Sequence, residues 1–115
     1  MIELYGIPNC DTVKKARKWL ESRDIDFTFH DFKKEGVTAS LLEDWIAKAG
    51  LDIVLNKRGT TWRKLPDDVK QDLDHDKALQ LMTENPSMIK RPVLVRQDGS
   101  VHIGFKPELY AEILG

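Results

Sequence analysis

One stretch near the amino terminus indicates the fold: Tyr5-Gly6-Ile7-Pro8-Asn9-Cys10-Asp11-Thr12-Val13-Lys14-Lys15-Ala16. The apolar start over residues 1–5 predicts a buried strand, and the Gly, Pro and Asn that follow predict the turn that ends it. Apolar residues then recur at helical spacing, with basic residues on the other face: Val13, Ala16, Trp19 and Leu20 against Lys14, Lys15, Arg17 and Lys18. Asp11 or Thr12 is expected to cap this helix. The stretch therefore predicts a strand, a turn and a helix, with Cys10 just before the helix.

A second strand is expected over residues 25–29, where Ile25, Phe27 and Phe29 alternate with polar residues. Two strands joined by a helix form a β-α-β unit, so these strands should run parallel with a right-handed crossover.

The middle of the chain is predicted to be helical. One helix should start at Thr38 and end at Gly50. Residues 51–65 are ambiguous: Leu51, Ile53, Val54 and Leu55 suit a short buried helix, and residues 56–61 should form a loop. Pro66 should open another helix. Asp74 or Asp76 should start the next, which should end near residues 85–86.

The last part of the chain has the pattern of an antiparallel hairpin followed by a helix. Residues 93–95 and 101–103 form apolar runs around a turn at Asp98-Gly99, and a helix should start at Pro107 with Leu109, Ile113 and Leu114 facing inward. The chain is thus predicted to be one α/β domain over residues 1–115. Its small mixed four-stranded sheet, built from β-α-β and then β-β-α, is interrupted by a helical insertion at about residues 36–90.

Composition limits the classes of function. The 115 residues are 41% hydrophobic and carry a net charge of −1, with one cysteine. These values exclude a disordered chain, a membrane-spanning protein and a generic nucleic-acid binder, and no metal site is expected. No secretory signal is visible, so we expect a cytoplasmic protein, monomeric by default.

Cys10 is the candidate nucleophile. At the start of a helix, backbone N–H groups and the helix dipole stabilise a thiolate, which is the reactive form of cysteine. The alternative is an inert, small buried residue at a tight turn. Because Val13 stands where a Cys-x-x-Cys pair would place its second thiol, any adduct of Cys10 must be resolved by another molecule, such as glutathione or a partner protein.

Six basic residues are candidates for binding an anion: Lys57, Arg58, Arg63, Lys64, Arg91 and Lys106. The alternative is ordinary solvated surface charge. The Arg91-Pro92 bond precedes a predicted strand, and base rates favour its trans form. His30, His75 and His102 lack metal-ligand spacing and are interpreted as structural or surface residues.

Four segments together resemble the ArsC/Spx family, and most closely its small YffB-type bacterial branch. They are the stretch from Tyr5 to Ala16, Arg-Gly-Thr-Thr-Trp-Arg-Lys-Leu from Arg58, Lys-Arg-Pro-Val-Leu from Lys90, and Gly-Phe-Lys-Pro from Gly104. The resemblance spans the whole chain. It implies a thioredoxin-like fold with an inserted helical subdomain, and it implies that Pro92 follows a cis bond, against the base rate.

The resemblance also implies roles for individual residues. Family arsenate reductases use one cysteine as nucleophile and arginines to bind the oxyanion, with glutathione and glutaredoxin completing the reduction. By position, Cys10 matches the nucleophile and Arg91 the arginine before the proline. Arg58 is chosen for the loop arginine, with Lys57 and Arg63 as alternatives. Lys106 stands where those enzymes have arginine, and a lysine clamps an oxyanion more weakly.

Three functions follow as hypotheses. The first is a glutathione-dependent thiol–disulfide oxidoreductase with glutathione as co-substrate and no bound cofactor. The second is an arsenate reductase, against which Asp11 argues because its charge lies beside the incoming anion. The third is a non-catalytic, Spx-like regulatory or protein-binding module. Spx-type members bind RNA polymerase and typically carry a Cys-x-x-Cys switch, which Val13 removes here.

Overall fold

The computed structural model describes residues 2–114, so Met1, which the first predicted strand included, lies outside the described residues. The chain divides into two compact units. The sheet unit comprises residues up to Glu35 and from Arg91 onward, and the helical unit spans Gly36–Lys90, where the sequence predicts the insertion.

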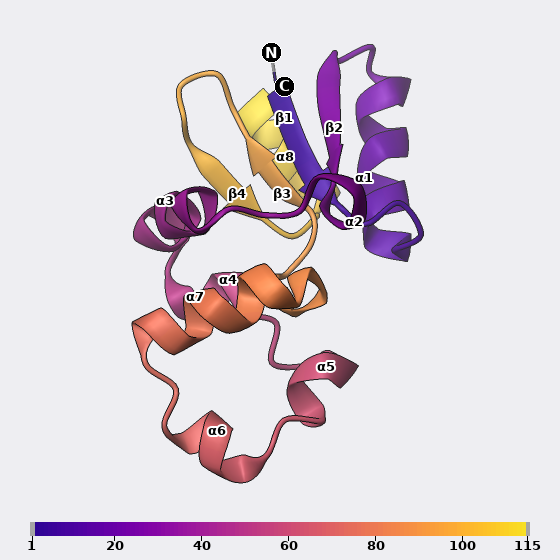
Figure 1. Cartoon of the computed structure of the whole chain (residues 1–115). Coiled ribbons are helices and arrows are strands. Elements are labelled where there is room, and N and C mark those ends of the chain that lie inside the picture. Colours follow the sequence, from indigo (N-terminus) through magenta and orange to yellow (C-terminus); the bar gives the residue numbers. More distant parts are fainter. Residues whose placement is uncertain (1, 115) are drawn as a thin grey trace. The chain divides into compact units, whose positions relative to one another are not determined.

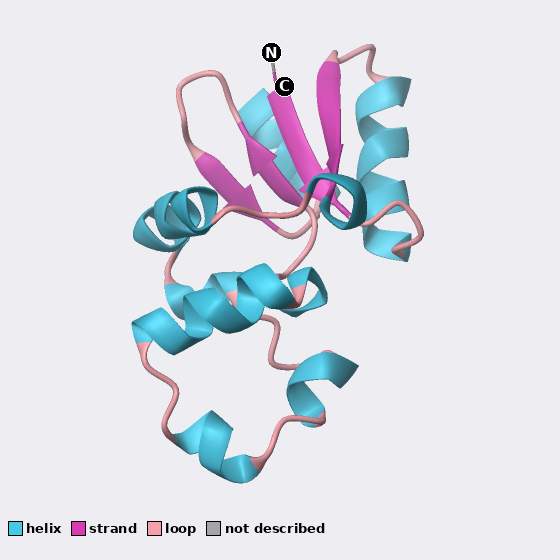
Figure 2. Cartoon of the chain, viewed as in Figure 1, coloured by secondary structure: helices cyan, strands magenta, loops and turns pink. Residues whose placement is uncertain are grey.

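The sheet unit contains one four-stranded mixed sheet in the order β2-β1-β3-β4 (Figure 1). Its elements are β1 (Ile2–Gly6), α1 (Asp11–Ser22), β2 (Phe27–Asp31), α2 (Phe32–Glu35), β3 (Val93–Val95), β4 (Val101–Ile103) and α8 (Pro107–Leu114). β1 and β2 run parallel, whereas β3 is antiparallel to both β1 and β4. The predicted β-α-β unit and terminal hairpin are therefore confirmed (Figure 2).

One face of the sheet forms the core of this unit. Leu4 and Leu94 pair across β1 and β3 and are fully buried against Ala16 and Leu20 of α1 and Tyr110 of α8. Ile113 and Leu114 pack on this cluster as predicted. Tyr110 is the fully buried residue of α8, whereas the sequence pattern predicts Leu109, Ile113 and Leu114 as the inward-facing residues.

Two boundaries in the sheet unit differ from the prediction. β2 begins at Phe27, two residues later than expected, because Ile25 closes the end of α1: its N–H donates to the Leu20 carbonyl oxygen at 3.0 Å. The cap of α1 is Cys10 itself, in an extended conformation, and the two predicted caps, Asp11 and Thr12, already belong to the helix.

The helical unit contains α3 (Ala39–Ala49), α4 (Leu51–Val54), α5 (Thr60–Arg63), α6 (Asp67–Gln71), α7 (His75–Glu84) and the 3₁₀ turn η1 (Pro86–Met88). Thr38 and Asp74 cap α3 and α7 by accepting backbone N–H groups, and Gly50 ends α3 with a positive φ of 96°. The predicted loop over 56–61 is shorter than expected, because α5 begins at Thr60.

None of the helices formed by residues 2–114 combines the length and the apolarity that crossing a bilayer requires.

Candidate functional site

Cys10 lies at the junction between β1 and α1. A tight turn precedes it, in which the Cys10 N–H donates to the Ile7 carbonyl oxygen at 3.1 Å. Gly6 allows the end of β1 to approach α1 closely: a Cβ at Gly6 would lie 2.8 Å from a methyl carbon of Val13. The sequence thus places the thiol at the N-cap of a helix that packs tightly on its own strand.

Arg91 reaches the same position from the start of β3. The Arg91–Pro92 bond is cis, as the family resemblance implies, and the expectation of a trans bond from base rates is wrong here. The Pro92 carbonyl oxygen accepts the Gly104 N–H at 2.8 Å, which ties this segment to the residues after β4. The Arg91 side chain forms a hydrogen bond with the Cys10 thiol.

The environment of Cys10 favours its thiolate. Burial raises the pKa of the half-buried thiol, but the Val13 amide, the Arg91 side chain and the Thr12 amide together outweigh burial. The pKa of Cys10 therefore lies below the ordinary value of a thiol. The Cys10 side chain does not form a regular N-cap hydrogen bond. Backbone N–H groups in the first turn of a helix nevertheless stabilise a negative charge on a nearby sulfur. This arrangement favours the reactive interpretation of Cys10 over the inert one.

Within residues 2–114, the structure shows no contact between Lys106 and the Cys10 thiol. Lys106 is exposed just before α8, its carbonyl oxygen accepts the Tyr110 N–H at 3.0 Å, and its ammonium forms no ion pair within residues 2–114. The predicted role of Lys106 as an anion-binding residue therefore stays a prediction.

Arg58 belongs to the helical unit, in the loop between α4 and α5. Its backbone N–H donates to the Asn56 side-chain oxygen at 3.2 Å, and its exposed side chain lines a pocket of about 300 Å³. Lys57, the neighbouring alternative, pairs with Asp52 at 3.7 Å and lies over the Trp62 ring at 5.7 Å. Of these two neighbouring cations, Arg58 is therefore the one whose charge no described carboxylate offsets.

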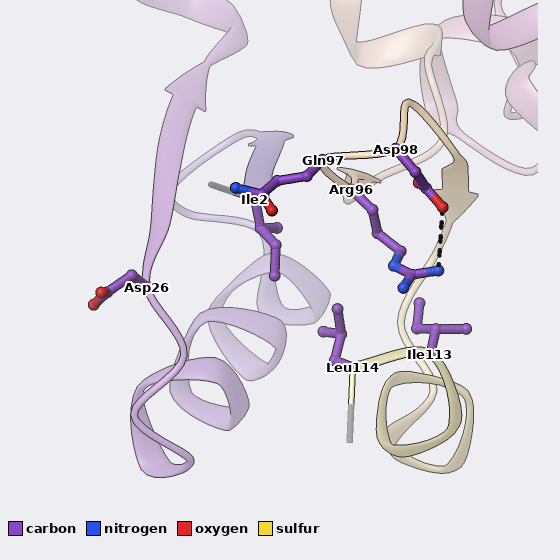
Figure 3. Close-up of a pocket in the computed structure, with 7 residues that line it drawn as sticks. All are labelled: Ile2, Asp26, Arg96, Gln97, Asp98, Ile113 and Leu114. Atoms are coloured by element: carbon purple, nitrogen blue, oxygen red, sulfur yellow. Dashed lines mark ion pairs between the residues drawn. The ribbon is translucent and has the colours of Figure 1, made fainter.

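A larger pocket lies at the other end of the sheet, where β1 begins. It has a volume of about 480 Å³ and is lined by Ile2, Asp26, Arg96, Gln97, Asp98, Ile113 and Leu114 (Figure 3). Arg96 and Asp98 on the hairpin form an ion pair of 3.7 Å, drawn as the dashed line in Figure 3. The side chains that line this pocket include no thiol, hydroxyl or imidazole.

His30 on β2 lies at the centre of a cluster of side chains that the sequence did not indicate. The imidazole contacts Glu3 of β1 through Nε2 and Glu35 of α2 through Nδ1, the latter at 2.8 Å, and it stacks on Tyr5 with ring centroids 4.5 Å apart. Burial lowers the pKa of His30, but the two carboxylates outweigh this effect and raise it above its ordinary value. The register Tyr5↔His30 creates this cluster, and the spacing of residues in the sequence carried no signal of it.

Comparison with known proteins identifies the family. The model of the ArsC family matches residues 5–113. The chain belongs to the ArsC family. The solved structure of the YffB protein superposes with a TM-score of 0.94 at 49% identity, covering 100% of both chains. This ArsC-family chain therefore has a thioredoxin-like fold, as the resemblance implies.

Two further relatives of this ArsC-family chain carry different descriptions. An arsenate reductase related protein from Brucella melitensis is 51% identical, with a TM-score of 0.79 over 97% of this chain and 92% of that one. The global transcriptional regulator Spx 1 of Lactococcus lactis is 31% identical over 94% of this chain and 84% of its own length. ArsC-family membership therefore includes both enzyme-like and regulatory relatives.

Proposed function

We propose that this ArsC-family chain is a thiol–disulfide oxidoreductase in which Cys10 is the nucleophile and glutathione is the resolving thiol. The observation that carries the proposal is the convergence of the Arg91 side chain and the Thr12 and Val13 amides on the Cys10 sulfur. Such groups stabilise an anion at the sulfur and so increase the fraction of reactive thiolate at neutral pH.

The reaction takes place in two exchanges. The Cys10 thiolate attacks one sulfur of a substrate disulfide, an S–S bond forms between them, and the other substrate sulfur leaves as a thiolate. Glutathione thiolate then attacks the substrate sulfur of this mixed disulfide and releases Cys10. Electrons balance because one disulfide is consumed and one glutathione-containing disulfide is formed. The chain has a single cysteine, so the second thiol must come from outside it.

Arg91, which contacts the thiol, is proposed to stabilise the thiolate and a leaving thiolate during each exchange. Lys106 and Arg58 are proposed to bind anionic groups of glutathione or substrate through their free charges. The Lys106→Ala and Arg58→Ala variants should then raise the KM for glutathione, while Cys10 keeps its reactivity towards a neutral alkylating reagent.

The test of the main proposal is the intact mass of the protein after incubation with oxidised glutathione, from pH 5 to pH 9. We expect one glutathionyl group on the wild-type chain, formed readily below pH 7, and none on Cys10→Ser. Modification that is slow and rises only near pH 8 to 9 would contradict the proposal and favour a regulatory, protein-binding role of the kind found in the Spx relatives.

Arsenate reduction is the second enzymatic candidate, supported by the Brucella relative and by the guanidinium beside the thiol. Turnover of arsenate with glutathione and glutaredoxin tests it directly. Asp11, the first residue of α1, places a carboxylate next to Cys10, and we therefore expect no turnover.

A further inference from the structure

The exposed face of α1 carries an excess of positive charge beside Cys10. Lys14, Arg17, Lys18 and Glu21 line one pocket of about 210 Å³ on this helix. These residues recur at the three- and four-residue spacing that places side chains on the same helix face. We call Lys14, Arg17 and Lys18 the cationic strip. Glu21 offsets one of its three charges.

No residue of the cationic strip forms an ion pair within the described part of the chain. Lys14 and Lys18 are exposed and form no ion pair or side-chain hydrogen bond within residues 2–114. The Arg17 guanidinium lies over the Phe29 ring of β2, 4.4 Å from its centroid, so its position is fixed by an aromatic contact and not by a carboxylate. Elsewhere, Lys48 and Lys57 do pair with nearby acids.

The strip begins one helical turn from the nucleophile. The Lys14 N–H donates to the Cys10 carbonyl oxygen at 2.9 Å, which makes the two residues neighbours along α1. At a rise of about 1.5 Å per residue, Lys14 lies roughly 6 Å and Lys18 roughly 12 Å beyond Cys10 along the helix axis. An extended peptide advances about 3.3 Å per residue, so it would span this length with about four residues.

We propose that the cationic strip docks an acidic segment of a protein substrate and aligns that segment's disulfide with Cys10. This inference rests on the proposed function, which supplies the exchange at Cys10. The matching segment has acidic residues about two and four positions from its own cysteine. A small free anion is a poorer match, because exposed lysines bind a single charge weakly, whereas several carboxylates on one chain add their attractions.

The test uses short peptides in which one cysteine is joined by a disulfide to neutral 2-mercaptoethanol. Aspartates stand two and four positions from this cysteine in one peptide, and asparagines replace them in a second. The Cys10 thiolate attacks the peptide sulfur and releases the mercaptoethanol thiolate. The reaction is run at low ionic strength, and the intact mass of the protein follows the formation of the protein–peptide disulfide. We expect the aspartate peptide to react about tenfold faster than the asparagine peptide with the wild-type chain.

Charge reversal on the strip should remove this preference. In Lys14→Glu/Lys18→Glu the ratio of the two rate constants should fall to about one or below. Lys15→Glu is the control and is compared with Lys14→Glu alone, so that each variant reverses one charge; Lys15 lies on the same helix, is also exposed and does not line the pocket. It should keep most of the wild-type ratio. Equal rates for both peptides with the wild-type chain, or an equal loss in Lys15→Glu, would overturn the docking proposal.

A neutral disulfide separates this proposal from the proposed function. If bis(2-hydroxyethyl) disulfide reacts normally but the peptide ratio is one, only the docking proposal fails. If this neutral disulfide does not react with Cys10 at all, the proposed function fails. The docking proposal is then judged by binding of the aspartate peptide with serine in place of cysteine: strip-dependent binding retains the docking surface, and no binding overturns it.

Discussion

The two ends of β1 differ in how their charges are arranged. At its carboxyl end, the Arg91 side chain and two backbone amides converge on the sulfur of Cys10, and the pKa of this thiol is lowered. At its amino end lies a pocket of about 480 Å³ in which Arg96 is paired with Asp98 and whose lining includes no thiol. The proposed reactivity therefore belongs to the carboxyl end of β1, where charge converges on the thiol, and not to the amino end, where the pocket of about 480 Å³ lies.

The largest effect on the Cys10 thiol is expected from removal of the Arg91 side chain. In Arg91→Ala the pKa of Cys10 should rise, because the hydrogen bond and the positive charge that lower it are lost. Alkylation by a neutral reagent at pH 6 should slow by about ten- to a hundredfold, since a hydrogen bond to a charged group contributes about 1.5–3 kcal/mol. At pH values where both thiols are ionised the two rates should converge.

The conservative variant Arg91→Lys sharpens this experiment, because it keeps the charge and loses the planar guanidinium. It should react at a rate between those of the wild type and Arg91→Ala. An unchanged pH profile in Arg91→Ala would show that the backbone amides of α1 alone set the reactivity of Cys10.

A smaller effect is expected for His30, whose charge is compensated by Glu3 and Glu35. The folded-state pKa of His30 is raised, so its stabilisation is fully present below the ordinary histidine pKa and is lost as the pH rises through the raised value. Between pH 6 and pH 8, wild type should lose about 0.5–1 kcal/mol more free energy of unfolding than His30→Gln, because the partners are partly exposed.

Urea denaturation at the two pH values measures this difference. The alkylation rate of Cys10 in His30→Gln should match that of the wild type. An equal pH dependence of stability in both proteins would mean that the His30 cluster contributes nothing to folding.

The smallest effect on the thiol is expected from the pocket at the amino end of β1. Arg96→Ala should leave the alkylation rate of Cys10 within about twofold of the wild type, because surface charge acts weakly over distance. It should raise the pKa of His102, which burial lowers first and the charge of Arg96 lowers further. NMR titration of the imidazole detects this change, and a slowed thiol reaction would contradict the separation of the two ends.

Much of the fold could be predicted from local patterns. The Thr38 cap, the Gly50 terminus and the terminal hairpin follow from single residues whose backbone preferences are strong. For the start of α7 the sequence leaves Asp74 and Asp76 as alternatives, and the structure has Asp74 as the cap. The errors fall where a local pattern competed with a nearby contact. Ile25 continued the alternation of β2, but its N–H bonds to the end of α1, so the strand starts later.

The features of the candidate site also fall into two groups, those that the sequence shows and those that only the folded chain shows. The sequence by itself determined that one thiol stands between a strand and a helix, that no second thiol can resolve its adducts, and that α1 carries a basic face. These are properties of neighbouring residues. Only the tertiary structure decided that Arg91 contacts Cys10 and that Glu3, His30 and Glu35 form one cluster. Sheet pairing brings these residues together from distant parts of the chain, and the register of that pairing is set by burial of one face of the whole sheet.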